Sequence, residues 1–453
     1  MKTSALERIF RLKEHNTNVR TEITAGITTF MTMAYILAVN PAILGAAGMD
    51  PYAVMLASAL AAAIGTLCMA AFANYPFVLA PAMGCNAVFA YTVVLGMGVS
   101  WQMALFAVFV EGLIFLLLSL FNIREAIFNA FPYNLKQATS AGIGLFIAFV
   151  GLQNAGLVIG DPTTLVNIVN FTADFHNTGL TALLALLGLL LIAVLLIRGV
   201  TGGILLGMLL TWGAGIVLEF SGIYTPSVSC IPVWEHAGLA PLKQTLFACF
   251  RLDFADFRLF DFIVIIFTFL FMDLFDTLAT LMGVASKANM LDEQQRLPNI
   301  KGALFADAIA TTAGALLGTS TTGTYVESAA GCQAGGRTGL TALTAAALFL
   351  LSIFIAPLII SIPYFATAPA LIVVGVYMIS AIKNVELEDF SEAIPAFITV
   401  VMMPLTYSVV NGIFLGIISY AAINLLSGKH KEKQITPMIY GLAILFICKY
   451  IFL

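Results

Sequence analysis

Five acidic residues lie within long apolar stretches of the chain, namely Glu111, Asp273, Asp276, Asp307 and Glu327. A charged side chain at the centre of a bilayer costs about 2.5–3.5 kcal/mol on insertion scales, so such a residue usually has a function. Asp273 and Asp276 are three residues apart and share one helix face. Carboxylates that approach each other in a low dielectric repel, and a proton bound by one relieves the repulsion. The pair is therefore a candidate for reversible proton binding, although one member could instead brace nearby backbone.

Two further polar groups follow glycines in short apolar segments. Glu327 comes one turn after Gly323, and we expect it within a half-helix that faces the helix of Asp273. Asn86 follows Gly84 at the matching place earlier in the chain, and its amide can both donate and accept hydrogen bonds. Glu327 is a candidate binding residue, whereas Asn86 could bind a ligand or cap a half-helix.

The other two acids in apolar stretches have structural interpretations. We expect Asp307, together with Thr311 and Thr312, to brace extended backbone nearby. Glu111 could pair with a hydroxyl group or gate a path. Neither is placed in the binding site.

Metal, nucleotide and histidine chemistry finds no support in the sequence. The four histidines lie in polar segments, and the six cysteines are scattered without metal-ligand spacing. No nucleotide-binding loop or hydrolase motif occurs in its structural context. Proton coupling would therefore depend on carboxylates, and we expect no cofactor, no metal and no enzymatic activity.

The composition places these acids in a membrane protein. Of 453 residues only 44 are charged, 60% are hydrophobic, and mean hydropathy is +1.00. A soluble protein cannot bury that much apolar surface, so lipid must cover it. This excludes a soluble enzyme, a nucleic-acid binder and a secreted disulfide-rich protein.

Apolar runs predict an all-α protein with fourteen transmembrane spans. Their expected ranges are 23–44, 53–72, 82–97, 102–121, 137–158, 178–197, 200–219, 261–284, 302–318, 323–334, 338–360, 367–383, 393–408 and 409–427. The polar segment 1–22 precedes them. A basic loop and an apolar tail, 428–453, follow, and the tail could span, lie in the interface or pack on the bundle.

The basic residues set the expected orientation. With both terminal basic segments in the cytoplasm, 16 of the 20 Lys and Arg residues fall on the cytoplasmic side, as the positive-inside rule requires. We therefore expect a multi-pass protein of the cytoplasmic (inner) membrane.

Weak internal repeats indicate two copies of a seven-span unit. GILLG at 203–207 matches GIFLG at 412–416, and APAMGCN at 80–86 takes the place of TSTTGTY at 319–325. Seven spans per copy would invert the second copy in the membrane, as in many secondary transporters. The third and tenth spans are short and interrupted, which predicts extended backbone before a half-helix in each. Such paired interruptions indicate a transport site.

Several motifs resemble those of AzgA-like purine permeases in the nucleobase–ascorbate transporter superfamily. The matching segments are APAMGCNA at 80–87, FMDLFDTL at 271–278, GTS at 318–320, YVES at 325–328 and GGRTGLT at 335–341. The resemblance runs from about residue 6 to the C-terminus. It implies a core domain at 23–121 and 261–360 and a gate domain at 137–219 and 367–427.

The resemblance also implies a function. Members of the family import hypoxanthine, guanine or adenine with protons, and related transporters work as homodimers with an elevator motion. The substrate contacts of the family fall on Asn86, Asp273 and Glu327, and we add their neighbours Gly84, Gly323 and Thr324. Asp276, Asp273 and Glu327 are the candidates for proton coupling. A purine base carries donors and acceptors on its edge, which carboxylates and an amide can recognise.

Other functions remain open at this point. The same fold could carry uracil, xanthine or an anion. A channel is disfavoured because it would use rings of ligands around a pore.

Overall fold

The computed structural model describes residues 5–120, 132–232, 238–252, 259–288, 290–292, 297–429, 433 and 435–452. The elements of the first half are α1 (Ala5–Ile9), α2 (Val19–Met33), α3 (Ile36–Ala46), α4 (Pro51–Cys68), η1 (Met69–Ala73), β1 (Leu79–Pro81), α5 (Met83–Ala87), η2 (Val88–Gly96), α6 (Trp101–Leu120), α8 (Tyr133–Asn154), β2 (Val158–Asp161), β3 (Leu165–Ile168), η3 (Phe175–Gly179), α9 (Leu180–Ile197) and α10 (Gly203–Phe220). Those of the second half are α11 (Leu242–Thr245), η4 (Ala248–Phe250), α12 (Leu259–Lys287), α13 (Ile300–Leu317), β4 (Thr322–Thr324), α14 (Ser328–Gln333), α15 (Gly339–Ser352), η5 (Ile353–Ile355), α16 (Ala356–Ile360), α17 (Tyr364–Ile379), η6 (Ser380–Asn384), α18 (Phe390–Leu405), α19 (Val409–Leu426) and α20 (Pro437–Phe452).

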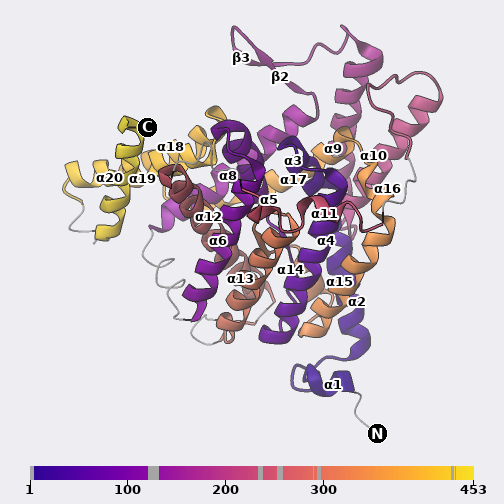
Figure 1. Cartoon of the computed structure of the whole chain (residues 1–453), viewed down its shortest axis with the longest axis horizontal. Coiled ribbons are helices and arrows are strands. Elements are labelled where there is room, and N and C mark those ends of the chain that lie inside the picture. The colour runs from indigo at the N-terminus through magenta and orange to yellow at the C-terminus, as the bar shows by residue number, and fades with distance from the viewer. Residues whose placement is uncertain are drawn as a thin grey trace.

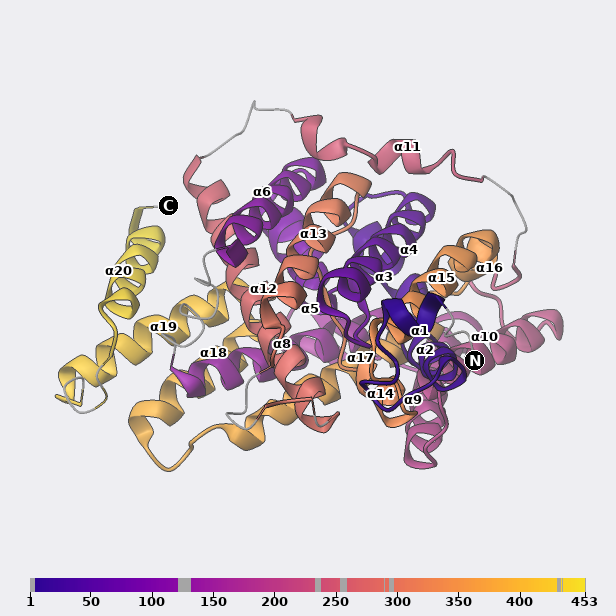
Figure 2. The same cartoon turned by 90° about the horizontal axis from the view of Figure 1, so that it is seen from below.

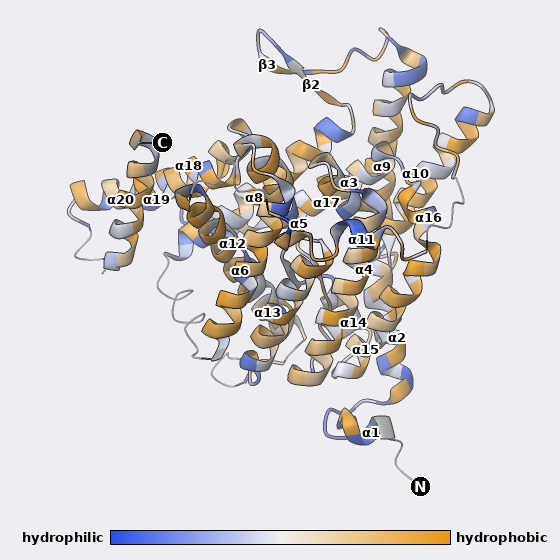
Figure 3. Cartoon of the chain, in the orientation of Figure 1, coloured by the Kyte–Doolittle hydropathy of each residue, from blue (hydrophilic) through white to orange (hydrophobic). Residues whose placement is uncertain are grey.

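Eleven helical stretches of the described chain are long and apolar enough to cross a membrane. Two more expected spans coincide with the shorter apolar helices Met83–Gly96 and Phe390–Leu405. The expected tenth span, 323–334, holds only β4 and the six-residue α14. Hydrophobic residues run along the helices, and hydrophilic ones gather in the connections and at the N-terminus (Figure 3). The chain is thus a mostly helical, multi-pass membrane protein. The expected orientation rests on all Lys and Arg residues of the chain. Five of these lie outside the described residues: Lys2, Arg124, Arg258, Arg296 and Lys431.

The helices form two groups (Figures 1 and 2). In one group α13 packs on α4 and α6, and α15 packs on α2 and α4. In the other α8 packs on α17 and α18, α9 on α10 and α17, and α19 on α18. The two groups meet where α3 contacts α17, α2 contacts α10 and α5 contacts α8.

Side chains that accept hydrogen bonds begin several of these helices. Asp50 precedes Pro51, and its carboxylate accepts from Ala53 N at 2.7 Å. Asn299 and Ser408 cap α13 and α19 in the same way. A side-chain acceptor satisfies one of the backbone N–H groups left free in the first turn of a helix, which stabilises the helix by about 1 kcal/mol.

Two extended segments pair at the centre of the first group. β1 and β4 are antiparallel, with Ala80 opposite Gly323 and Pro81 opposite Thr322. The pairing continues on either side, through Ala82 N to Thr321 O at 2.8 Å and Tyr325 N to Val78 O at 3.0 Å. These are the extended segments expected in the two interrupted spans. Because their backbone groups pair with each other, the chain can be non-helical at this depth.

The glycines of the two matching motifs lie at helix–helix contacts. Gly207 faces Ile192 of α9, and Gly412 and Gly416 face Met403 and Thr399 of α18. A methyl group at any of the three would collide with its neighbour. Small residues at this spacing therefore let α10 approach α9 and α19 approach α18.

The apolar tail packs on the bundle as α20. Phe446 is fully buried, and its ring stacks on Phe414 of α19 with centroids 3.7 Å apart. Phe267 of α12 lies 5.8 Å from the same ring, and the Tyr450 hydroxyl donates to Asn411 Oδ1 at 2.9 Å. The tail thus packs on the bundle through α19 and α12.

Candidate functional site

Asp273 lies beside the antiparallel pair formed by β1 and β4. It is on α12, its side chain is fully buried, and a β-carbon at Gly323 would lie 3.7 Å from its Oδ1. The same position would be 3.3 Å from Thr277 Oγ1 and 3.9 Å from Ala82 Cβ. Gly323 therefore lets β4 approach the carboxylate of α12 closely.

A single hydroxyl group joins two carboxyl groups at this point. Thr277 Oγ1 lies 2.9 Å from Asp273 Oδ1 and 3.0 Å from Asp307 Oδ1, and all three side chains are buried. A hydroxyl has one proton and can donate to only one of two carboxylates. For both contacts to be hydrogen bonds, one carboxyl group must itself carry a proton and donate it to Thr277. The arrangement is thus suited to holding a proton between two acids.

Asn86 also lies next to the paired strands β1 and β4. It is in α5 and fully buried, its Oδ1 accepts a hydrogen bond from the Ser320 hydroxyl, and its Nδ2 lies 3.5 Å from Pro81 O. The amide thereby ties the first broken segment to the second. Thr324 is buried too, and its hydroxyl has no hydrogen-bond partner among the described residues. A buried hydroxyl without a hydrogen-bond partner is unfavourable unless a ligand or a water molecule forms a hydrogen bond with it.

Gly84 marks where α5 meets its neighbours. A β-carbon there would lie 3.0 Å from Ile143 of α8 and 3.6 Å from Met272 of α12. Because α8 belongs to the other helix group, Gly84 lies at the contact between the two groups.

Glu327 differs from its expected position. It immediately precedes α14, which begins at Ser328, so it is not inside the half-helix. Its Oε1 accepts a hydrogen bond of 2.7 Å from the hydroxyl of Tyr35, which sits in the break between α2 and α3. The expectation that Glu327 lies within the half-helix is therefore wrong by one residue, whereas α14 does contact α12, the helix of Asp273. The turn at 325–327 delays the helix and directs this carboxylate toward the first span.

A cavity of about 380 Å3 adjoins Glu327. Thr32, Gln333, Tyr377 and Ser380 also line it. Tyr377 and Ser380 belong to α17 and η6 of the second helix group, whereas Thr32 and Gln333 belong to the first. The cavity thus lies between the groups, and its size is within the range of about 300–1,000 Å3 that is typical of ligand sites.

A second cavity, of about 410 Å3, adjoins Asp276. It is lined by Asp276 and Thr280 of α12 and by Lys136 of α8, and it shares Tyr377 and Ser380 with the first. Asp276 is only partly buried, unlike Asp273. The two cavities give Glu327 and Asp276 access to the boundary between the helix groups, while Asn86 and Asp273 lie deeper.

The remaining acids support the extended segments. Thr321 donates to Glu111 Oε2 at 2.8 Å, which is the hydroxyl pairing considered for this residue. Thr311 donates to Thr322 O at 3.1 Å and so braces β4, as expected. The Asp307 carboxylate contacts a side chain of α12, since its Oδ1 lies 3.0 Å from Thr277 Oγ1. Thr312 donates to Ala308 O within its own helix.

Three polar partners were missed from the sequence. Thr277 has a local signal, since it lies one turn after Asp273 on the same helix face. Ser320 lies in a recognised motif, but nothing local links it to Asn86. Tyr35 is 292 residues from Glu327, so only the tertiary fold joins them.

Known proteins resemble this chain over almost its full length. Residues 20–415 match the model of the Permease family. The chain is 42% identical to the adenine permease AdeP of Escherichia coli, over 99% of this chain and 96% of AdeP. It is also 42% identical to the guanine/hypoxanthine permease PbuG of Bacillus subtilis, over 99% of this chain and 100% of PbuG.

A solved structure shares the fold. The transmembrane domain of the cyanobacterial bicarbonate transporter BicA superposes with a TM-score of 0.64 at 18% identity, covering 88% of this chain and 97% of that domain. Permeases move solutes and do not transform them, so the chain is a transmembrane permease and not an enzyme. It belongs to the Permease family and, within the nucleobase–ascorbate transporter superfamily, to the AzgA-like purine permeases that its motifs resemble.

Proposed function

We propose that this protein is a secondary active transporter that imports purine nucleobases (hypoxanthine, guanine or adenine) together with protons. The observation that carries the proposal is the set of buried polar groups beside the paired strands β1 and β4: Asn86, which contacts Ser320 and Pro81, and Asp273, which lies next to Gly323. Permease relatives named for adenine and for guanine/hypoxanthine support the substrate class.

The base would bind by its polar edge. Asn86 supplies a donor and an acceptor, Asp273 and Glu327 supply acceptors, and the Thr324 hydroxyl is available to a ligand. Gly84 and Gly323 leave room for a flat ring beside the backbone. A site that hydrogen-bonds such an edge rejects solutes that lack the matching groups, because its buried polar atoms are then left unpaired.

Protons would be the coupling ions. The Thr277 hydroxyl shared between Asp273 and Asp307 favours a proton on one of these acids. Asp276 and Glu327 adjoin the cavities, from which they could exchange protons with water. Binding of a base to Asp273 would change the hydrogen bonds of this group and so link substrate binding to protonation.

Transport would follow an elevator motion across fourteen spans in two inverted repeats. The core (23–121 and 261–360) would carry Asn86, Asp273 and Glu327 as one body past the gate (137–219 and 367–427). The antiparallel pairing of β1 with β4 supports an inverted relation between the two halves. We further propose a homodimer in the cytoplasmic membrane with both basic terminal segments in the cytoplasm.

Uptake of radiolabelled bases tests the function. In a permease-deficient bacterium, we expect saturable uptake of at least one of hypoxanthine, guanine and adenine that increases from pH about 8 to about 6 and stops with an uncoupler. Unlabelled uracil, xanthine and bicarbonate serve as competitors. No purine uptake, together with uptake of labelled uracil, xanthine or bicarbonate, would assign the protein to another solute. A requirement for sodium in place of protons would contradict the coupling.

Disulfide cross-links test the motion, in a background without the native cysteines. Met31 Cβ lies 3.5 Å from a β-carbon at Gly202, across the boundary, and Ala25 Cβ lies 3.0 Å from one at Gly336, within the core. Both pairs start on α2; the first is at the short end of the disulfide range of about 3.5–4.5 Å, and the second reaches that range if the two backbones separate by about 0.5 Å. We expect the Met31→Cys/Gly202→Cys link to stop transport and the Ala25→Cys/Gly336→Cys link to spare it. The reverse result would contradict a rigid core.

A further inference from the structure

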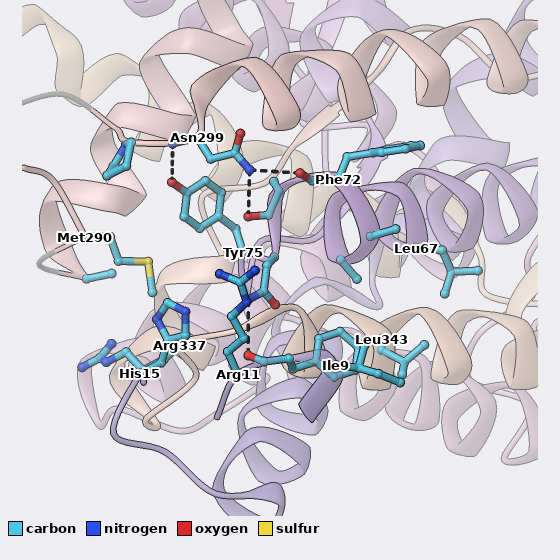
Figure 4. Close-up of a pocket in the computed structure, with 17 residues that line it drawn as sticks. Ile9, Arg11, His15, Leu67, Phe72, Tyr75, Met290, Asn299, Arg337 and Leu343 are labelled. Atoms are coloured by element: carbon cyan, nitrogen blue, oxygen red, sulfur yellow. Dashed lines mark hydrogen bonds between the residues drawn. The ribbon is translucent and has the colours of Figure 1, made fainter. Parts of the chain in front are cut away.

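A third cavity shares no lining residue with the two that adjoin Glu327 and Asp276. It has a volume of about 860 Å3 and lies where the N-terminal segment meets the end of η1, the segment before α13 and the segment before α15. Hydrogen bonds hold its wall in place: Asn299 Nδ2 donates to Phe72 O at 3.0 Å, and Tyr75 OH accepts from Asn299 N at 3.0 Å (Figure 4). The cavity is therefore part of the folded core.

One end of the cavity is cationic. Arg11, His15 and Arg337 lie together there, and its described lining includes no acidic residue (Figure 4). Arg337 donates to two backbone carbonyls, both through Nη1, and its Nη2 and Nε have no hydrogen-bond partner in the described part of the chain. Arg11 has an exposed contact of 4.0 Å with Glu14, and such surface pairs contribute little. Most of the donors at this end are available to an anion.

Arg11 is held at the cavity by its neighbours. Phe10 and Leu12 on either side are buried, and Asn74 Nδ2 donates to Phe10 O at 3.3 Å. The backbone of Arg11 is left-handed, with φ of 51°. This conformation is unfavourable for a non-glycine residue by about 1–2 kcal/mol and persists where the surroundings impose it, often at functional sites. Here it places a guanidinium group at the mouth of the cavity.

The backbone near Arg337 is equally fixed. The buried carboxylate of Glu22 accepts from Arg337 N at 2.9 Å, from the Thr338 hydroxyl at 2.9 Å and from the Thr341 hydroxyl at 2.7 Å. Arg11 and Arg337 thus come from two separately anchored segments. A guanidinium group matches the geometry of a phosphate group, so each of the two arginines could donate to one.

The opposite end of the cavity is apolar and close to lipid. Leu67, Phe72 and Leu343 line it, and the side chains of Leu67 and Phe72 are 37% and 48% exposed. These residues lie at the ends of the candidate spans Pro51–Ala73 and Gly339–Ile360. The cavity therefore lies near one end of two candidate spans, with guanidinium groups on one side and exposed apolar side chains on the other.

We propose that this cavity binds the phosphate group of an anionic phospholipid, with Arg11, His15 and Arg337 on the phosphate and Leu67 and Phe72 against the acyl chains. Basic pockets at the ends of membrane helices on the cytoplasmic side bind anionic headgroups in this way. A free phosphate ester offers the same charge, but it would leave the apolar end unfilled. The proposal does not depend on the substrate of the transporter.

Native mass spectrometry of the purified full-length protein tests the proposal. The probes are dioleoyl phosphatidylglycerol and, as the zwitterionic control, dioleoyl phosphatidylcholine. We expect preferential binding of phosphatidylglycerol that is about fivefold weaker in Arg11→Gln, which removes one guanidinium charge, and weaker still when His15→Gln removes a further ring donor. Lys13→Gln is the matched control, because Lys13 is exposed in the same segment and does not line the cavity, so it should bind nearly as the parent does.

Several results would overturn the proposal. One is unchanged binding in the Arg11→Gln/His15→Gln double variant, and another is an equal loss in Lys13→Gln, which would indicate general charge attraction. A third is displacement of phosphatidylglycerol by equimolar sn-glycerol 3-phosphate, which would indicate a site for free phosphate. Melting in phosphatidylcholine alone verifies that the variants are folded, so a loss of phosphatidylglycerol binding in a variant that melts like the parent supports the site.

Discussion

Two groups of carboxylates in this protein have different kinds of hydrogen-bond partner. At the start of α18, Lys429 and Lys433 contact Asp389 at 2.7 and 3.0 Å, and Lys433 contacts Glu392 at 2.7 Å. In the first helix group, Asp273 accepts from the Thr277 hydroxyl, and Glu327 accepts from the Tyr35 hydroxyl. The carboxylates at the start of α18 (the α18 group) are thus paired with lysine ammonium groups, whereas Asp273 and Glu327 (the central group) accept from uncharged hydroxyl groups.

The difference bears on which group can exchange protons. The ammonium groups of Lys429 and Lys433 hold the pKa of Asp389 well below its usual range, so this carboxylate stays ionised at any pH at which a cell transports solutes. A hydroxyl donor brings no compensating charge, so a buried acid beside it can be stable with a proton. The α18 group is suited to fixing structure, and the central group to binding and releasing protons.

The largest expected effect is the removal of a central carboxylate. We expect Asp273→Asn and Glu327→Gln each to lower purine uptake by at least about 100-fold, since a buried acceptor is lost and the donors of the base are left unpaired. The measurement is uptake of labelled base, with the amount of protein in the membrane determined in parallel. The matched control is Glu392→Gln, the same kind of change in the lysine-bound group, which should transport normally. Normal kinetics in both central variants would remove these residues from the site.

A smaller effect is expected from the hydroxyl that holds Glu327. Tyr35→Phe deletes only the donor of the 2.7 Å bond, so the carboxylate keeps its charge and loses its orientation. We expect KM for the base to increase about tenfold, the usual cost of a hydrogen bond to a charged group. The control is Tyr75→Phe, which removes a hydroxyl group from the cavity beside the N-terminal segment. If both variants had the same KM, Tyr35 would not position Glu327.

The smallest effect is expected from the lysine-bound group. Asp389→Asn keeps a side chain that can cap α18 and removes only the charge. Because the pKa of Asp389 is depressed in the folded protein, its stabilising contribution is present above the unfolded pKa of about 3.9 and is lost only as the pH falls below it. The variant should therefore melt slightly lower by the same amount at pH 6 and pH 8. A shift in the pH profile of uptake would contradict the division between the two groups.

Much of this arrangement could be predicted because membrane burial makes charges rare. The acids at 273, 276 and 327 are visible against an apolar background, and the interrupted spans are visible from prolines and glycines beside them. The extended backbone before each half-helix follows from the same residues, and the structure contains it as β1 and β4. The family follows from motifs along the whole chain.

Other features could not be predicted because they depend on distant residues. The hydrogen bond between Tyr35 and Glu327 and the one between Ser320 and Asn86 span hundreds of residues. The start of α14 after Glu327 depends on the pairing of β4 with β1, which fixes the preceding backbone. The tail at 435–453 was undecided from the sequence because apolar residues suit both lipid and the surface of α19.

Proton movement with the base is the most direct test of the account. The purified protein is placed in liposomes that enclose a pH-sensitive dye, and a purine base is added outside without any other ion gradient. We expect the base to enter together with protons, so the lumen acidifies in proportion to uptake, and we expect no acidification with Asp273→Asn. Entry of the base at the normal rate without acidification would contradict the claim that the central carboxylates couple purine transport to protons.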